Sequence, residues 1–225
     1  MKCLLTYTSL TLTLLCAGAC EKQRATTNAT GPNSFSTAEE AANKAKTDLL
    51  SILRSGKNMN LGVDEAALAK SQPARLVKHY QITFEQLLTA DSAATFGNLA
   101  QNEMATVVPF VSDNSVVTIA EVAKDDKGWR VTSLVDQSVS NDLNALRTIT
   151  GETSQDEITI YDLPHSAVKV YGIKKDNSEM FYSDYPGFNV REGVSAERLL
   201  SVVKGDAAEF QRNYGAALKE QKVVR

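Results

Sequence analysis

A serine hydrolase in this chain would have to use His79 or His165, because these are its two histidines. Such an enzyme needs a serine that a histidine activates and a carboxylate that orients the histidine. The sequence has neither a Gly-x-Ser-x-Gly elbow nor a His-Glu-x-x-His motif. Alternation between residues 76 and 82 places His79 opposite Leu76 and Tyr80, so we expect a solvated surface side chain. His165 follows a Leu-Pro pair in an expected turn, where functional residues concentrate. A hydrolase that uses His165 is therefore one alternative, and a polar turn residue is the simpler interpretation.

The aromatic segment between residues 161 and 188 is the other candidate for chemistry, in this case recognition. Its tip reads Tyr182-Ser183-Asp184-Tyr185-Pro186-Gly187-Phe188. Tyrosine offers a large contact area with one polar end, which suits binding. We therefore expect a binding loop that uses Tyr182, Asp184, Tyr185 and Phe188, with at least two rings exposed. The alternative is that these rings fill the core beside the C-terminal helices, near Phe210 and Tyr214.

The three cysteines all lie within the first 20 residues. Cys20 follows the small residues Ala17-Gly18-Ala19, which follow Lys2 and an apolar run from residue 4 to residue 15. The run is too short to span a membrane and fits the hydrophobic region of a signal peptide. This pattern resembles the lipobox of bacterial lipoproteins, with Ala17 where leucine is usual. The resemblance implies a signal peptide over residues 1–19, acylation of Cys20 and a lipid anchor in the cell envelope. With Glu21 after the cysteine, it implies the outer membrane.

The composition of the chain that remains after the signal peptide excludes several kinds of partner and site. Removal of 19 of the 225 residues leaves 206, and loss of Lys2 leaves 23 basic against 27 acidic residues, a net charge of −4. A mildly acidic chain without a basic block is a poor partner for nucleic acid. Without a cysteine beyond residue 20, the folded part has no disulfide, thiol nucleophile or zinc–thiolate site. We expect neither a cofactor nor a metal, and we expect the membrane to be contacted through the lipid.

The N-terminal half predicts a tether, a helix and a meander of strands. Residues 20–35 are polar and have no apolar period, which indicates a lipidated flexible tether. The segment Ser36-Thr37-Ala38-Glu39 is a capping box that opens a helix with an alanine-rich face, ended near Gly56. Asp64 caps a shorter helix. Strands are expected over residues 76–82, 104–111, 115–123 and 128–135, followed by a helix near residues 139–146.

The C-terminal half repeats the mixture of strands and helix. Strands are expected over residues 158–163, 167–173 and 179–182. The helical region carries Leu199, Val203, Ala207, Phe210, Tyr214 and Leu218 at intervals of three or four. Gly205 followed by Asp206 indicates one helix that ends and a second that begins. The polar segment 150–157 is a candidate sub-boundary within a globular domain over residues 36–225.

These elements predict an α+β fold, with an antiparallel sheet packed against an N-terminal helix and C-terminal helices. The architecture resembles cystatin-like and NTF2-like domains. The function we expect is that of a lipid-anchored bacterial envelope protein that binds a protein, peptide or small ligand without converting it. An inhibitor or folding-assistance module for a secreted enzyme is a further alternative. An exposed strand edge would favour that alternative through strand addition.

Overall fold

The computed structural model describes residues 33–55, 61–151, 157–175 and 178–221. The expected signal peptide, Cys20 and the tether up to residue 32 lie outside the described residues, as do residues 152–156 of the candidate sub-boundary. In the described ranges, no helix combines the length and the apolar character needed to cross a bilayer.

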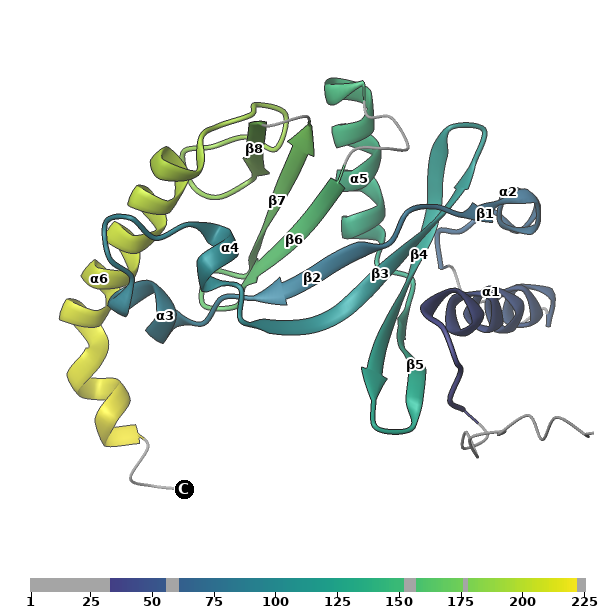
Figure 1. Ribbon diagram of the computed structural model, residues 1–225, viewed down its shortest axis with the longest axis horizontal. Helices are drawn as coiled ribbons and strands as arrows, with labels where there is room; N and C mark the ends of the chain where they lie inside the picture. Colours follow the sequence, from purple (N-terminus) through teal and green to yellow (C-terminus); the bar gives the residue numbers. More distant parts are fainter. Residues whose placement is uncertain (1–32, 56–60, 152–156, 176–177, 222–225) are drawn as a thin grey trace, which may run out of the picture.

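Eight strands form one mixed sheet, in the order β5-β4-β3-β2-β6-β7-β8, with β1 beside β3 (Figure 1). The strands are β1 (Gln72–Pro73), β2 (Val77–Gln81), β3 (Asn102–Ser112), β4 (Ser115–Asp125), β5 (Gly128–Leu134), β6 (Glu157–Leu163), β7 (Val168–Lys175) and β8 (Ser178–Ser183). All paired strands are antiparallel except β2 and β6, which are parallel. The α+β class is confirmed, and the expectation of a wholly antiparallel sheet is wrong at this pair. Turn residues signal hairpins between consecutive strands. Residues 82–156, which include three other strands, separate β2 from β6, so no turn signals their pairing.

Within the described residues, six helices accompany the sheet: α1 (Ala38–Arg54), α2 (Glu65–Lys70), α3 (Phe84–Thr89), α4 (Phe96–Leu99), α5 (Gln137–Thr150) and α6 (Ala196–Gln221). The Thr37 side chain caps α1 by accepting a hydrogen bond from the Glu40 amide, one residue later than the sequence suggests. Asp64 caps α2 as expected.

The C-terminal region is one helix, so the expected break at Gly205 is wrong. A glycine inside a helix costs about 1 kcal/mol relative to alanine. Here the buried residues Leu199, Val203 and Ala207 lie on both sides of Gly205 along one helix face, and their packing offsets that cost. The spacing of three or four residues continues to Phe210 and Tyr214, but these side chains are not buried: they are 45% and 55% exposed.

The helices cover the two faces of the sheet unequally. Helix α5 packs on one face, where Val139, Leu143 and Leu146 join apolar residues of six strands in one core cluster. Helices α1 and α2 cover the opposite face over β3 and β4, and α1 also packs on β5. Helices α3, α4 and α6 cover that opposite face at the β6–β8 end. Figure 1 shows α1 and α6 at the two ends of the sheet. The middle of the face opposite α5 therefore lies between these two helical groups.

Candidate functional site

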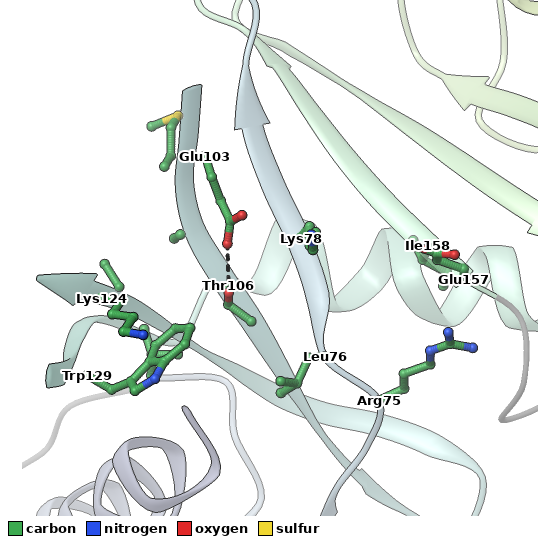
Figure 2. A pocket seen from close by; sticks show the side chains of 13 residues that line it. Arg75, Leu76, Lys78, Glu103, Thr106, Lys124, Trp129, Glu157 and Ile158 are labelled. Atoms are coloured by element: carbon green, nitrogen blue, oxygen red, sulfur yellow. Dashed lines mark hydrogen bonds between the residues drawn. The ribbon is translucent and has the colours of Figure 1, made fainter. Parts of the chain in front are cut away.

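A groove of about 620 Å³ lies on this middle part of the sheet (Figure 2). Its size falls within the range of roughly 300–1,000 Å³ that small-ligand sites occupy. Thirteen residues from β2 to β6 and the segment before β2 line it: Arg75, Leu76, Lys78, Glu103, Met104, Ala105, Thr106, Val122, Ala123, Lys124, Trp129, Glu157 and Ile158. We refer to this site as the groove.

Strand register brings the central residues of the groove onto one face. Lys78 on β2 pairs with Thr106 on β3 and with Thr159 on β6, and Thr106 pairs with Val122 on β4. Residues paired in this way point to the same side of a sheet. Because side chains alternate along a strand, the neighbouring residue Val77 points to the other face, into the cluster beneath α5. The floor of the groove thus contains a row of side chains across three strands: Lys78 on β2, Thr106 on β3 and Val122 on β4.

Charges of both signs line the groove. A side-chain hydrogen bond with Tyr80, and then the charges of Tyr80, Glu103 and Glu157, raise the pKa of Lys78, so its ammonium group stays charged. The Thr106 hydroxyl donates to Glu103 Oε1 at 3.2 Å, which fixes that carboxylate against the floor. In Figure 2, Lys78 lies between one end marked by Lys124 and the other marked by Arg75 and Glu157. The groove can therefore contact a ligand that carries positive and negative groups.

Two large apolar side chains also line the groove: Trp129, the one tryptophan of the chain, and Met104, which is 45% exposed. Two backbone hydrogen bonds hold Trp129: its amide donates to the Phe35 carbonyl oxygen at 2.8 Å and its carbonyl accepts from the Phe35 amide at 2.7 Å. Gly128 permits this approach, because its φ is +125° and an added Cβ would lie 2.6 Å from the Phe35 oxygen. Phe35, placed by sequence in the tether, is thus bonded to the sheet. The indole is presented by a fixed backbone.

The expected binding loop is largely part of the core. Tyr182 is 8% exposed and Tyr185 is 3% exposed, so the expectation that these rings are exposed is wrong for both. Tyr185 belongs to the cluster beneath α6, donates its hydroxyl to Asp206 Oδ2 at 3.0 Å, and has a pKa raised to about 12, mainly by burial. Asp184 Oδ1 accepts a hydrogen bond from the Val190 amide and so closes the loop. Phe188 is half-buried beneath the Arg198 guanidinium group, 5.7 Å from the ring centre.

Neither histidine is among the residues that line the groove. His79 is 5% exposed, so the expectation of a surface side chain is wrong; Val77 and His79, not Tyr80, lie on the buried face of β2. Its Nδ1 lies 3.4 Å from Glu121 Oε1. His165 lies in the turn expected for it and packs against the Phe84 ring at 5.5 Å, and burial lowers its pKa. The adjacent Ser166 hydroxyl donates to the Leu163 carbonyl oxygen, so this serine and His165 do not form a nucleophile–base pair.

A second exposed feature is a pair of aromatic side chains on α6. Phe210 and Tyr214 on α6 lie 5.0 Å apart, and Phe210 also meets Phe84 edge to face at 5.6 Å. These rings form a convex strip on a helix, whereas the groove is hollowed and carries charge. In the described part of the chain, no three His, Cys, Asp or Glu side chains converge as a metal site would require.

No protein-family model, curated protein or solved structure matches the chain. The geometry of the groove therefore carries the functional conclusion. Sequence reasoning missed this site because a groove depends on which part of a sheet the helices leave uncovered. The available signals were Lys78 next to the apolar Val77 and a single tryptophan next to a glycine turn.

Proposed function

We propose that this chain is a bacterial envelope protein, anchored through an acylated Cys20, that binds a small zwitterionic ligand such as a short peptide and does not convert it. The observation that carries the proposal is the groove, a hollow of about 620 Å³ on the uncovered middle of the sheet. The lipobox-like sequence before Cys20 supports the anchoring and the envelope location.

The chemistry of the groove supports this class of ligand. Lys78, Lys124 and Arg75 can contact a carboxylate, and Glu103 and Glu157 can contact an amine. Trp129 and Met104 provide apolar contact for a side chain, and aromatic surface of this kind is typical of recognition sites. A ligand with one charge would meet repulsion from one of the two sets of charges. A peptide with two charged termini satisfies both sets.

The same residues support binding without conversion. Among the described residues that line the groove, none is a histidine, serine or cysteine, so the groove contains no Ser–His or Cys–His pair. The hydroxyl of Thr106 is engaged with the Glu103 carboxylate. The groove therefore offers contacts and charges, and it does not offer an activated nucleophile.

Trp129 gives a direct test, because its fluorescence reports from inside the groove. The probe is a pool of zwitterionic tripeptides without tryptophan. We expect the pool to change the fluorescence of Trp129 in a saturable way. Replacement of Lys78 by glutamate should weaken binding by about tenfold, since a charge-assisted contact becomes a repulsive one.

The matched control is Lys70→Glu, which makes the same charge change on the exposed surface of α2, outside the groove. We expect it to leave binding unchanged. Equal loss of binding in the two variants would show that only net charge matters, and a pool that leaves the fluorescence unchanged would remove the proposed ligand class. Mass spectrometry of the native protein should find an acylated Cys20, and another N-terminus would contradict the anchor.

A further inference from the structure

The exposed aromatic side chains of α6 continue a face that is buried earlier in the same helix. Leu199, Val203 and Ala207 are buried in the core cluster at the β6–β8 end of the sheet. At the same spacing along the helix, Phe210 and Tyr214 are exposed, with ring centroids 5.0 Å apart. Figure 1 shows that the C-terminal end of α6 continues past α3. We refer to Phe210 and Tyr214 as the α6 strip.

Helix α3 contacts one edge of the α6 strip and leaves the rest exposed. The Phe84 ring on α3 meets Phe210 edge to face at 5.6 Å, and this contact orients the Phe210 ring. Leu88 lies one helical turn after Phe84 and is also exposed. Exposed apolar side chains that gather on the surface of a folded domain are typical of interaction sites.

The α6 strip is small for a contact with a protein partner in solution. An aromatic side chain buries about 150–250 Å² in a contact, and about half of each residue of the strip is exposed, so the two together offer about 150–250 Å². A stable protein interface buries about 800 Å² on each partner. A contact as small as the strip is sufficient when its partner is already held nearby, at high effective concentration.

The proposed lipid anchor would hold one such partner nearby, namely the membrane. Residues 21–32 separate Cys20 from the first described residue, and a chain of that length spans at most about 40 Å when fully extended. In Figure 1, the segment before α1 and the C-terminal end of α6 both extend toward the lower side of the molecule. A membrane on that side would meet both the anchor and the α6 strip.

The charge at this end of the chain suits an anionic membrane. The whole chain has a net charge of −3, whereas residues 212–225 contain four basic residues and one acidic residue. Arg212 is exposed and lies two residues from each ring of the strip, which places it on the opposite side of the helix. Aromatic side chains on one face and basic side chains on the other are typical of helices that lie in a membrane interface.

We propose that the α6 strip docks on the surface of a bilayer that contains anionic phospholipids. Phe210 and Tyr214 enter the interface, and Arg212 lies on the polar side of the helix, from which its long side chain reaches the headgroups. The choice of the bilayer as partner rests on the proposed anchor at Cys20. A tether alone leaves the domain free to rotate above the membrane, whereas docking of α6 fixes its orientation.

Fluorescence quenching by lipids that are brominated on their acyl chains tests the docking. The native protein carries Tyr214→Trp as the probe and is placed in vesicles of phosphatidylglycerol and phosphatidylcholine. After subtraction of the Trp129 signal of the unmodified protein, we expect bromolipids to lower the emission of the new indole at least about twofold. The matched control is Ile149→Trp, at an exposed apolar position on α5, which packs on the other face of the sheet. Its indole should not be quenched.

A second pair of variants, made in the Tyr214→Trp protein, tests the role of charge. Arg212→Glu should reduce the quenching by at least about half, because it reverses a favourable charge next to an anionic surface. Lys70→Glu makes the same charge change on the exposed surface of α2 and should leave the quenching unchanged. Vesicles of phosphatidylcholine alone should quench the new indole less than the anionic vesicles do.

Several results would overturn the proposal. Absence of quenching, or quenching equal to that of Ile149→Trp, would show that the α6 strip does not meet the bilayer. Equal effects of Arg212→Glu and Lys70→Glu would show that this end of α6 does not select an anionic surface. A dimer without vesicles that Phe210→Ser dissociates would show that a second copy covers the strip.

Failure of this proposal is distinguishable from failure of the proposed function. Mass spectrometry reads the acylation of Cys20, and the response of Trp129 to tripeptides reads the groove. Quenching of the new indole reads the docking alone. Protein that lacks the acyl group is added to the same vesicles, so that the contact of the α6 strip with the bilayer is measured in either case.

Discussion

The face of the sheet opposite α5 serves two purposes in its two parts. At the β6–β8 end, the rings of Phe96, Tyr161 and Phe181 lie together beneath helices, with centroids 4.9 Å apart for Phe96 and Phe181 and 5.4 Å apart for Phe96 and Tyr161. In the middle, over β2, β3 and β4, the same face forms the groove. Tyr80 and Tyr161, whose rings stack at 6.2 Å, mark the transition between the two parts. The two parts differ in whether helices cover them. This covering, and not the aromatic content of the strands, decides whether a part of the face becomes hydrophobic core or a candidate binding site.

The largest expected contrast is in stability. Phe96→Ala should lower the free energy of unfolding by about 3–5 kcal/mol, since it removes a fully buried ring from the covered part. Met104→Ala should change it by no more than about 0.5 kcal/mol, because Met104 is an exposed residue of the groove. Urea denaturation of both variants measures the difference. Similar losses of stability in the two variants would show that the groove is closed in solution, and that the two parts of the face do not differ in this way.

Two glycines should respond in opposite directions. An added Cβ at Gly172 on β7 would lie 3.1–3.2 Å from Glu179, Phe181 and Tyr161, so Gly172→Ala should destabilise the protein by about 1–3 kcal/mol through overpacking. An added Cβ at Gly205 meets no atom within 4 Å, and Gly205→Ala should stabilise α6 by up to about 1 kcal/mol. Thermal melts of the two variants should move in opposite directions. A stabilising Gly172→Ala would mean that the ring packing at the covered end is loose.

A smaller effect depends on pH and concerns the face of the sheet on which α5 packs. The Tyr171 hydroxyl donates to Asp142 Oδ2 at 2.6 Å, and burial raises the pKa of Asp142 above its ordinary value of 3.8, with the hydrogen bond partly opposing that shift. Because the folded pKa is the higher one, the stabilisation from this group is fully present below pH 3.8 and is lost as the pH rises through the folded pKa.

Asp142→Asn keeps an acceptor for Tyr171 and does not titrate. The free energy of unfolding of the unmodified protein, relative to this variant, should therefore fall as the pH rises from about 3.5 to about 7. Denaturant titrations across that range measure the difference. A difference that is constant with pH would show that Asp142 is solvated, and that the α5 face is less closed than the contrast with the groove requires.

Local features of the sequence predicted much of the fold. The alanine face of α1, the Asp64 cap and the hairpin turn at Asp113 and Asn114, which have φ angles of 49° and 61°, depend on neighbouring residues and are confirmed. The parallel β2–β6 pair and the continuity of α6 depend on packing between distant segments, and the sequence predicted them wrongly. Tertiary packing outweighs local preference at such places.

The candidate site was harder to predict than the fold, for a related reason. The segment from Tyr182 to Phe188 has the composition of a recognition surface. However, Tyr182 on β8 is buried in the cluster beneath α5, and Tyr185 is buried in the cluster beneath α6. The side chains that line the groove are ordinary strand residues, and they form a site because no helix covers them. Alternation along β2 could have identified Lys78 as an exposed residue. The sequence analysis instead placed His79 on the exposed face, and the structure shows that His79 is buried and Lys78 is exposed.

Chemical-shift mapping by two-dimensional NMR, with the zwitterionic tripeptide pool as probe, tests the central claim most directly. We expect the shifts to change at the Trp129 indole N–H and at the amides of Lys78, Met104 and Thr106, which line the groove. The amides of Phe96 and Tyr161 in the covered part should remain unchanged. Shift changes concentrated at Phe210 and Tyr214, the exposed rings of α6, with none in the groove, would contradict it.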